Sequence, residues 1–410
     1  MENMKQTKVM IVAHFCAYGN EKSNNRFNYL AERLSNAGME VEIVTSSFCH
    51  KDKCQRTEIC DTQKPYTTKL IYEPSYKKNI SLKRLLISHP TIGHNLRKYL
   101  ENCEKPDVVY CAVPSVDVAL QAANYANKQG IPLVLDVLDL WPEAYKLILK
   151  KDILYKPVNW LLKRRVNRVY AAANQIVAVS DSYAHRAKSV NKKCENPITV
   201  FLGTDAVTFD ENIKLNTPIY TKSADEFWIG YCGTLGHSYD LSTVFKAVEL
   251  LSNRGINNIR LVVMGNGPFE NKFKKEASNL GIQCIFTGKL PYGQMCAQLA
   301  QCDISVNPIA AGSAASIINK HADYALAGMP VINTQESKEY KDLLINYACG
   351  INCTPGAVEQ VADAICTLAS DKELCFKMGE NARRMGIEKF DRQKTYESIV
   401  EMISLLDVEF

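Results

Sequence analysis

The sequence lacks any run of about 20 apolar residues, the length that an α-helix needs to cross a bilayer. It also lacks a Cys-x-x-Cys pair, although it contains 15 cysteines, which are scattered and odd in number. This pattern favours reduced thiols in the cytosol over a disulfide framework. The opening segment, MENMKQTK, is polar and leads directly into a predicted strand, so we expect no signal peptide.

The patterns of common cofactor sites are also absent. The first predicted loop has no Gly-x-Gly-x-x-Gly, which argues against a dinucleotide-dependent dehydrogenase. There is no Asp-x-Asp, and the spacing of Cys49, His50, Cys54 and Cys60 matches no zinc finger. We therefore expect neither a metal nor another cofactor.

Length and charge set the broad class of the protein. With 410 residues the chain is too long for one ordinary core, so we predict two domains. A composition of 46% hydrophobic and 23% charged residues is typical of a soluble globular protein. The formal net charge of +5 fits an anionic ligand or a membrane surface and does not require nucleic acid.

Alternating strand and helix patterns predict a parallel α/β architecture. The apolar stretch 8–14, the amphipathic helix 26–36 and the strand 41–45 form a βαβ unit, and the alternation restarts at 227–232. We predict a first domain at 1–205, a polar and irregular linker at 206–226, a second domain at 227–392 and a last helix at 393–410.

Acidic side chains gather where the predicted strand 131–136 ends. Asp136, Asp139 and Glu143 lie there, together with Trp141. The carboxyl ends of strands in open α/β sheets carry functional groups, and a carboxylate at that position can orient a hydroxyl group or accept a proton. The structural alternative is that Asp139 caps a helix that begins near Trp141.

Two segments of the second half could hold a diphosphate. At 233–240 a strand ends in a glycine-containing turn, which lets backbone N–H groups approach a phosphate. At 317–334 a short helix is predicted to begin near Asn319, where its dipole favours an anion, and Asp323 could accept hydrogen bonds from a ribose diol. The structural alternative for 317–334 is an ordinary connection between helix and strand.

Three of these segments resemble one enzyme family. The pattern N-K-x-x-D-Y-x-x-A-G-x-P-V-I at 319–332 resembles the donor-site segment of retaining glycosyltransferases of family 4 (group 1). D-L-W-P-E at 139–143 is similar to a signature of bacterial polysaccharide glycosyltransferases in that family, and G-x-L-G at 233–236 is similar to its donor diphosphate loop. The resemblance implies an α/β fold of the GT-B type, in which two Rossmann-like, doubly wound domains face a central cleft.

The resemblance also implies roles for individual residues. The C-terminal domain would bind a nucleotide-diphosphate sugar, and the N-terminal domain would bind an acceptor whose hydroxyl group is activated by Asp139 as a base. The donor-binding residues would be Gly233, Thr234, Leu235, Gly236, His237, Lys289, Leu290, Asn319, Lys320 and Asp323. The acceptor side or cleft would contain Gly19, Asn20, Arg26, Asp136, Trp141 and Glu143. Arg26 would meet an anion, although an ordinary surface arginine is an equally good interpretation.

The sequence departs from the family pattern at the donor site. Relatives often have two acids eight positions apart; Asp323 fits the second, but Ala315 occupies the first position. The diphosphate loop has Thr234 and His237 where relatives carry Arg and Lys. We therefore expect a lysine from elsewhere, Lys320 or Lys289, to stabilise the charge of the leaving group.

The stretch 146–168 contains eight basic residues and one acid, Asp152, with Trp160 and several leucines between them. It fits an anionic membrane surface, although a solvated helix face is the simpler explanation. Because relatives act on lipid-linked acceptors, the resemblance favours the membrane. We expect a cytoplasmic protein attached peripherally to the inner face of the cytoplasmic membrane, with no nucleic-acid partner.

We therefore predict a retaining glycosyltransferase of the hexosyl or N-acetylhexosaminyl type. It would move a sugar from a nucleotide-diphosphate donor to a hydroxyl of a lipid-linked saccharide, in capsular polysaccharide or O-antigen biosynthesis, without a metal. Two alternatives stay open. One is a sugar-nucleotide 2-epimerase of the same fold, which D-L-W-P-E disfavours; the other is a non-catalytic sugar-nucleotide-binding subunit, which Ala315 favours.

Overall fold

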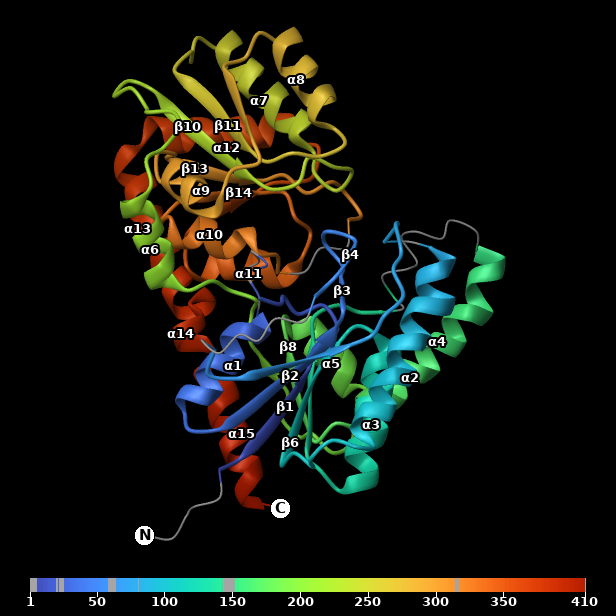
Figure 1. Cartoon of the computed structure of the whole chain (residues 1–410). Helices are drawn as coiled ribbons and strands as arrows, with labels where there is room; N and C mark the ends of the chain where they lie inside the picture. Colours follow the sequence, from blue (N-terminus) through green and yellow to red (C-terminus); the bar gives the residue numbers. More distant parts are fainter. Residues whose placement is uncertain are drawn as a thin grey trace. The chain divides into compact units, whose positions relative to one another are not determined.

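The computed structural model of the chain describes residues 6–19, 21, 26–57, 64–79, 81–141, 143, 152–313 and 317–409. It contains two compact units, each built on its own parallel sheet (Figure 1). The first unit consists of residues 1–200 and 396–410, and the second of residues 201–395.

The first unit has a seven-stranded sheet in the order β5-β2-β1-β6-β7-β8-β9, with all neighbours parallel. Its strands are β1 (Lys8–Val12), β2 (Glu40–Ser46), β5 (Thr67–Ile71), β6 (Val108–Val113), β7 (Leu133–Val137), β8 (Gln175–Ala178) and β9 (Ile198–Thr199). A short hairpin consists of β3 (Phe48–Cys49) and β4 (Cys54–Gln55). Every residue of the apolar strand β6 is buried, because helices cover both faces of the sheet.

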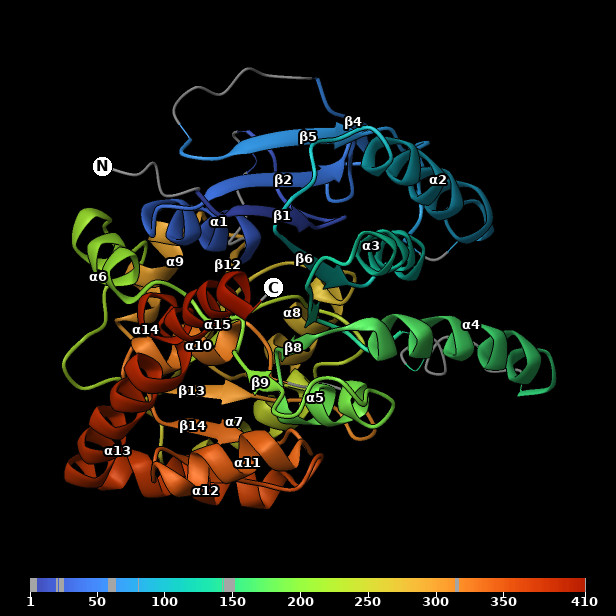
Figure 2. The ribbon, with the colours of Figure 1, turned by 90° about the horizontal axis from the view of Figure 1, so that it is seen from below.

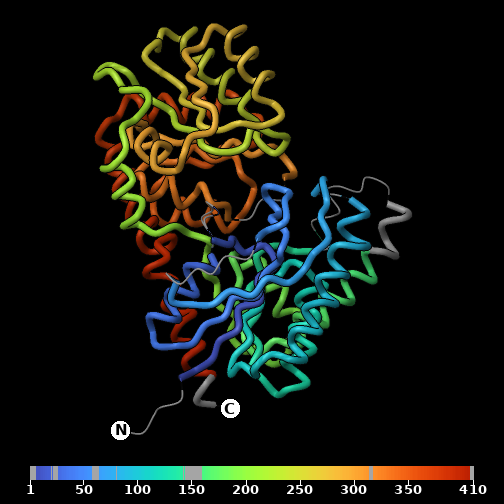
Figure 3. The backbone as a smooth tube through the Cα atoms, viewed as in Figure 1, coloured from blue at the N-terminus to red at the C-terminus, as the bar shows by residue number. Residues whose placement is uncertain are grey.

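Two groups of helices pack against this sheet (Figure 2). One face is covered by α2 (His89–Leu100), α3 (Val116–Gln129), α4 (Asp152–Ala172) and α5 (Asp181–Lys188), and the other by α1 (Arg26–Asn36) and α15 (Glu397–Glu409). A π-helical turn, η1 (Arg84–Ser88), leads into α2. Figure 3 shows the last part of the chain, in red, running along the blue strands of this unit.

The second unit has a six-stranded parallel sheet in the order β12-β11-β10-β13-β14-β15. Its strands are β10 (Phe227–Cys232), β11 (Ile259–Met264), β12 (Cys284–Gly288), β13 (Ile304–Asn307), β14 (Val331–Asn333) and β15 (Gly350–Asn352). The strands are short and rich in β-branched residues, and each is followed by a turn and a helix, which is the alternation that parallel pairing requires.

Helices also cover both faces of the second sheet. One face is covered by α7 (Leu241–Asn253), α8 (Glu270–Asn279) and α12 (Val358–Ser370). The other is covered by α9 (Tyr292–Leu299), α10 (Lys320–Leu326), α11 (Lys338–Asn346) and α13 (Lys372–Met385). After α13 the chain continues through η3 (Gly386–Phe390) and α14 (Arg392–Thr395).

The segment 206–226 differs from the irregular linker that the sequence predicts. It contains helix α6 (Ala206–Leu215), whose N-terminus is capped by Asp205, which accepts a hydrogen bond from the Thr208 amide at 2.7 Å. Phe209 of this helix is fully buried against Cys296 and Leu326 of the second unit. The prediction is wrong here because apolar residues one helical turn apart give α6 a buried face, which the polar composition of the segment conceals.

Within the described residues, no helix is both long enough and apolar enough to cross a membrane.

Candidate functional site

Glycine-rich turns pack together at the carboxyl edge of the second sheet. Gly233 follows β10, and Gly265 and Gly267 follow β11. The Gly233 amide donates to the Met264 carbonyl at 2.9 Å, and the Gly265 amide donates to the Gly288 carbonyl at 2.8 Å. A Cβ on Gly265 would lie 1.8 Å from the Gly233 oxygen, and one on Gly267 would lie 2.3 Å from the Leu235 oxygen. Only glycine permits this approach, so the turns after β10 and β11 pack into one layer of backbone groups, which we call the bed.

Lys320, the first residue of α10, lies against this bed. A Cβ built on Gly233 would be 3.1 Å from Lys320 Nζ. The Nζ atom lies 4.2 Å from the ring centre of Tyr231 and 4.0 Å from that of Tyr239. Lys320 is only 7% exposed, and Nζ has no hydrogen-bond partner among the described residues.

Burial has a clear electrostatic effect on this lysine. It lowers the pKa of Lys320 to about 7, because the charged form loses hydration and no acidic group of the described residues bonds to it. A buried cation is costly unless an anion accompanies it. The surroundings of Lys320 are therefore suited to binding an anion. Before an anion binds, the rings of Tyr231 and Tyr239 stabilise the ammonium group.

The start of α10 differs from the predicted anion site made of free helix N–H groups. The helix is only seven residues long, and its first turn is tight: the His321 amide donates to the Ile318 carbonyl and the Ala322 amide to the Asn319 carbonyl, both at 3.1 Å. Asn319 itself is exposed and its side chain makes no capping bond. The positive charge at this edge therefore comes from the side chain of Lys320 rather than from these amides.

Asp323 lies one helical turn after Lys320, on the same side of α10. Its Oδ1 accepts a hydrogen bond from the Tyr292 hydroxyl at 2.8 Å, and that hydroxyl also lies 3.1 Å from Thr204 Oγ1. Burial raises the pKa of Asp323 to about 6. The side chain is thus a carboxylate at neutral pH, able to accept further hydrogen bonds.

The other predicted donor residues are distributed around this edge. Thr234 and His237 are exposed, and the His237 ring packs edge-on against Phe269 with 4.3 Å between ring centres. Leu235 and Gly236 are buried. Lys289 is exposed and follows β12, and Leu290 packs against the core under α10. Ala315 lies outside the described residues.

Three tyrosines of this site were not predicted from the sequence. Tyr231 and Tyr239 bracket the 233–236 turn and contact Lys320, while Tyr292 bonds to Asp323. The available signal was their position: two flank the predicted diphosphate loop, and the third comes three residues after Lys289. Tyrosines are so common in cores that this position alone does not distinguish them.

In the first unit, Arg26 and Asp136 form a buried ion pair. Arg26 Nε lies 2.5 Å from Asp136 Oδ2, and the Tyr110 hydroxyl donates to the same oxygen at 2.8 Å. Arg26 also donates to the Val200 carbonyl at 3.0 Å. Their charges neutralise each other inside the core, so the structure contradicts the prediction that these two side chains face a ligand.

Asp139 follows β7 at the carboxyl edge of the first sheet. Its Oδ2 accepts a hydrogen bond from Trp141 Nε1 at 3.0 Å, and its Oδ1 accepts one from the Leu140 amide at 2.8 Å. Burial raises the pKa of Asp139 above its ordinary value, although both hydrogen bonds act in the opposite direction. A fixed carboxylate of raised pKa is suited to accept a proton from a hydroxyl group.

The remaining acceptor-side residues have other surroundings. Glu143 forms an ion pair with Arg186, with 2.7 Å between Oε1 and Nε. Gly19 is exposed in the loop after β1 and has a φ of 56°, which a glycine adopts without strain. Asn20 lies outside the described residues.

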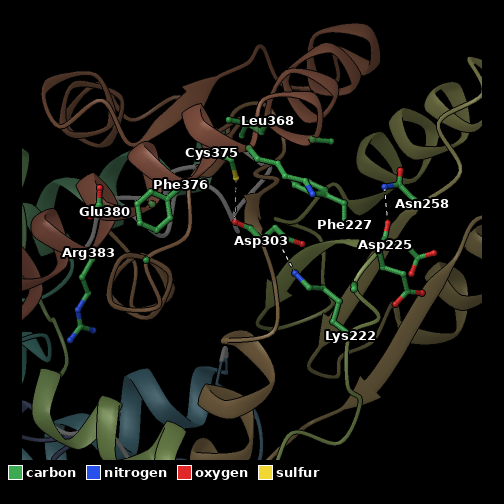
Figure 4. A pocket seen from close by; sticks show the side chains of 16 residues that line it. Lys222, Asp225, Phe227, Asn258, Asp303, Leu368, Cys375, Phe376, Glu380 and Arg383 are labelled. Carbon is green, nitrogen blue, oxygen red and sulfur yellow. Dashed lines mark hydrogen bonds and ion pairs between the residues drawn. The ribbon is translucent and has the colours of Figure 1, made fainter.

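A separate pocket of about 590 Å³ lies at the opposite edge of the second sheet (Figure 4). It is lined by residues that include Phe227, at the start of β10, and Asp303, just before β13. Figure 4 shows Lys222 bonded to Asp303 at this edge, at 2.6 Å. The pocket is therefore at the amino ends of the strands, away from the glycine turns, and it does not belong to the site around Lys320.

Comparisons with known proteins agree with this architecture. Residues 213–385 match the family model for glycosyl transferases group 1, and residues 24–201 match the model for glycosyltransferase family 4. The capsular polysaccharide biosynthesis glycosyltransferase CapM of Staphylococcus aureus is 23% identical over 246 residues. That match covers 56% of this chain and 61% of CapM, which is less than two thirds of that relative.

Two solved structures match almost the whole chain. HepE from Anabaena, in complex with UDP, is 14% identical with a TM-score of 0.68, and the match covers 98% of this chain and 100% of HepE. Sucrose-phosphate synthase from Thermosynechococcus elongatus is 14% identical with a TM-score of 0.70, covering 99% and 100%. HepE has also been solved with UDP-glucose. The predicted GT-B fold and family are thus confirmed, and the chain belongs to the group 1, family 4 glycosyltransferases.

Proposed function

We propose that the protein is a retaining enzyme that transfers a sugar from a nucleoside-diphosphate donor to a hydroxyl group of a saccharide in polysaccharide biosynthesis. The observation that carries the donor assignment is Lys320, a buried cation with no bonded partner among the described residues, held against a bed of backbone turns. HepE binds UDP and UDP-glucose, and CapM acts in capsular polysaccharide biosynthesis, which supports this substrate class. Retention of configuration rests on the family likeness.

Departure of the diphosphate is the step that the second unit is built to assist. Negative charge develops on the leaving phosphate, and Lys320, once protonated, would neutralise it from a fixed position. Asp323 would accept hydrogen bonds from the ribose hydroxyls of the same nucleotide. Because a lysine supplies the charge, we propose that transfer needs no metal, and we expect EDTA to leave the rate unchanged.

Activation of the acceptor is assigned to Asp139 in the first unit. The hydrogen bond from Trp141 fixes the orientation of the carboxylate, and burial makes it more basic than an exposed aspartate. In the proposed reaction Asp139 takes the proton of the acceptor hydroxyl. The oxygen of that hydroxyl attacks the anomeric carbon from the face on which the diphosphate departs, so the configuration is retained.

A thermal-shift screen with UDP, GDP, dTDP and CMP tests the donor assignment. A nucleotide at about 100 times its dissociation constant should stabilise the chain by about 2.7 kcal/mol. Lys320→Met should lose this stabilisation, whereas Lys289→Met, which removes an exposed lysine near the same edge, should keep most of it. Equal stabilisation of the Lys320→Met chain and the wild type would disprove the assignment.

Product analysis separates the proposal from its two alternatives. Incubation with donor and acceptor should give a glycoside of unchanged anomeric configuration by NMR. An epimerised sugar nucleotide from donor alone would identify an epimerase, and nucleotide binding without any turnover would identify a binding subunit.

We propose further that the acceptor is lipid-linked and that α4 attaches the protein to the inner face of the cytoplasmic membrane. Trp160 and Leu161 of α4 are 61% and 55% exposed, and the Arg164 guanidinium lies 5.6 Å from the Trp160 ring centre. Figure 2 shows α4 beside α3 and α5. Exposed apolar groups with basic neighbours suit an anionic bilayer surface. The predicted basic residues at 146–151 lie outside the described residues.

Vesicle sedimentation tests this attachment. The chain should sediment with vesicles that contain phosphatidylglycerol and stay in solution with phosphatidylcholine alone. The double variant Trp160→Ser, Leu161→Ser should bind the anionic vesicles at least tenfold more weakly. Binding that is unchanged in this variant would exclude α4 as the attachment site.

A further inference from the structure

A group of basic and aromatic side chains lies at the carboxyl edge of the first sheet, and of its members only Trp141 is part of the mechanism proposed above. Its members come from the loop after β1, the β3–β4 hairpin, the segment that leads into α2 with the first residue of that helix, and the segment after β7. They are Phe15, His50, Lys53, Tyr76, Arg84, His89 and Trp141, which we call the Arg84 cluster.

Arg84 is at the centre of this cluster and only 7% exposed. Its guanidinium carbon lies 5.4 Å from the ring centre of Phe15, 5.4 Å from that of Tyr76 and 5.2 Å from that of Trp141. Its Nε donates to His89 Nε2 at 3.0 Å, and its Nη1 donates to the Asn79 carbonyl at 2.6 Å. These are neutral partners, and no carboxylate of the described residues makes an ion pair with Arg84.

The buried acid of this region, Glu73, is already occupied. Its Oε2 lies 2.7 Å from His14 Nε2 and accepts from the Ser46 hydroxyl at 2.6 Å, and its Oε1 accepts from the Ser88 hydroxyl. Burial acts to raise the pKa of Glu73, but His14 and the two hydroxyl groups outweigh it and lower the pKa to about 2. The carboxylate is therefore engaged by these groups, and within the described residues the charge of Arg84 has no counter-ion.

The excess positive charge acts on the neighbouring histidines. Burial, assisted by the charges of Arg84 and Lys53, lowers the pKa of His50 to about 4. Burial, assisted by His14 and Arg84, lowers the pKa of His89 to about 2. Protons are thus repelled from this region, as expected where an always-charged guanidinium lies in a poorly solvated place.

A metal ion is the other ligand that such a cluster could attract. The side-chain nitrogen and oxygen atoms of His14, Glu73 and His89 lie within 4.8 Å of one another. However, His14 and Glu73 bond to each other, and His89 Nε2 accepts its hydrogen bond from Arg84. A dication there would meet the guanidinium at close range, so the electrostatics favour an anion over a cation.

We propose that the Arg84 cluster binds an oxyanion, a phosphate or a carboxylate group, carried by the acceptor. Arg84 supplies the charge and a planar fork of donors that matches either group, and the partly exposed rings of Phe15 and Trp141 pack against the apolar part of the ligand. Trp141 also holds Asp139, so the bound group lies beside the candidate base. Only the origin of the ligand, the acceptor, rests on the proposed function.

Direct titration tests the site without relying on activity. The measurements use the Lys320→Met chain, so that the buried cation of the second unit does not contribute. Glucose 1-phosphate and glucuronate are the two oxyanion probes, and glucose is the neutral control. We expect one or both oxyanions to bind by calorimetry and glucose not to bind; which probe binds distinguishes phosphate from carboxylate.

Variants and NMR locate the binding. Arg84→Gln should weaken the oxyanion at least tenfold, whereas Arg97→Gln, which removes an exposed arginine of the adjoining helix α2, should leave it unchanged. The pKa of His50, followed by its ring proton signals, should rise when the oxyanion binds. If Arg84→Gln does not fold, Arg84→Lys, which keeps the charge but loses the fork, should still bind with reduced affinity.

Three results would overturn the proposal. The first is that neither oxyanion binds. The second is that Arg84→Gln binds the oxyanion as tightly as the chain that keeps Arg84. The third is tight binding of Zn²⁺ that Glu73→Gln abolishes. None of them affects the thermal-shift result for nucleotides at Lys320, so the donor assignment and this site fail or succeed separately.

Discussion

Lys320 combines a binding role with a cost in stability. Burial lowers its pKa from 10.5 to about 7, so the unfolded chain binds this proton more tightly than the folded chain. The loss of folding stability caused by burying the protonated lysine is therefore largest below pH 7, and it decreases to zero as the pH rises towards 10.5. We expect Lys320→Met to raise the free energy of unfolding at pH 6.5 by ~2 kcal/mol and to add little above pH 10. Urea unfolding at the two pH values measures this; a destabilised variant at pH 6.5 would contradict it.

Two side chains of the second unit should give nucleotide binding a pH optimum. Asp323, with a pKa raised to about 6 by burial, accepts ribose hydrogen bonds only when ionised, and Lys320, with a pKa lowered to about 7, attracts phosphate only when protonated. Affinity should therefore fall below pH 6 and above pH 7. Calorimetry from pH 5 to 8.5 checks this. Asp323→Asn should flatten the acid side and Lys320→Met the alkaline side; a flat wild-type profile would refute it.

Asp139 should affect the chemical step rather than nucleotide affinity. Asp139→Asn keeps the size of the side chain but removes the base, so we expect kcat to fall by about 100-fold or more. The dissociation constant for the nucleotide should not change. Acceptor-dependent release of the nucleoside diphosphate measures kcat; full turnover by the variant would show that another group takes the proton.

At the scale of single elements, the turns after β10 and β11 should tolerate a methyl group at one glycine and reject it at another. A Cβ on Gly265 would lie 1.8 Å from the Gly233 oxygen, whereas a Cβ on Gly236 meets nothing closer than 3.7 Å. We expect Gly265→Ala to cost several kcal/mol and to abolish nucleotide stabilisation, roughly as a backbone clash does. Gly236→Ala should stay close to wild type. Thermal unfolding with and without nucleotide compares them; equal behaviour would contradict the packing.

Elements with a strong pattern were predictable and those set by packing were not. The apolar stretches at 8–14 and 227–232 indicate strands, and β1 and β10 lie there. Helix α6 was missed because its buried face is short, and α10 lacks the free amides expected at its start because its first turn tightens. The buried face of α6 depends on neighbours that are remote in the sequence, whereas the first turn of α10 tightens through bonds between residues three positions apart.

The same division applies to the candidate site. Asp139, Lys320 and Asp323 lie in segments whose amino-acid patterns resemble those of a known family, so their positions were predictable. The ion pair of Arg26 and Asp136 was not, because 110 positions separate the two residues. The members of the Arg84 cluster are also far apart in the sequence, from Phe15 to Trp141, so their positive charge is brought together only by folding.

At the scale of the whole molecule, the last helix is a structural part of the first unit. Tyr396, Ile399 and Ile403 are fully buried in its core. A chain ending at 395 loses this burial, so we expect the free energy of unfolding of its first unit to fall by several kcal/mol and that unit to melt at a lower temperature. Nucleotide binding in the second unit should be kept. A chain ending at 406 retains these residues and serves as the control. Equal melting of the two chains would contradict this.

The place of α15 also has a consequence for synthesis. A ribosome produces residues 1–200 first, yet their hydrophobic core stays open until Tyr396 and Ile403 have left the exit tunnel. Residues 201–395 are complete earlier, because everything that their core needs has already been made. The second unit, although it is synthesised after residues 1–200, can therefore complete its folding before the first unit does.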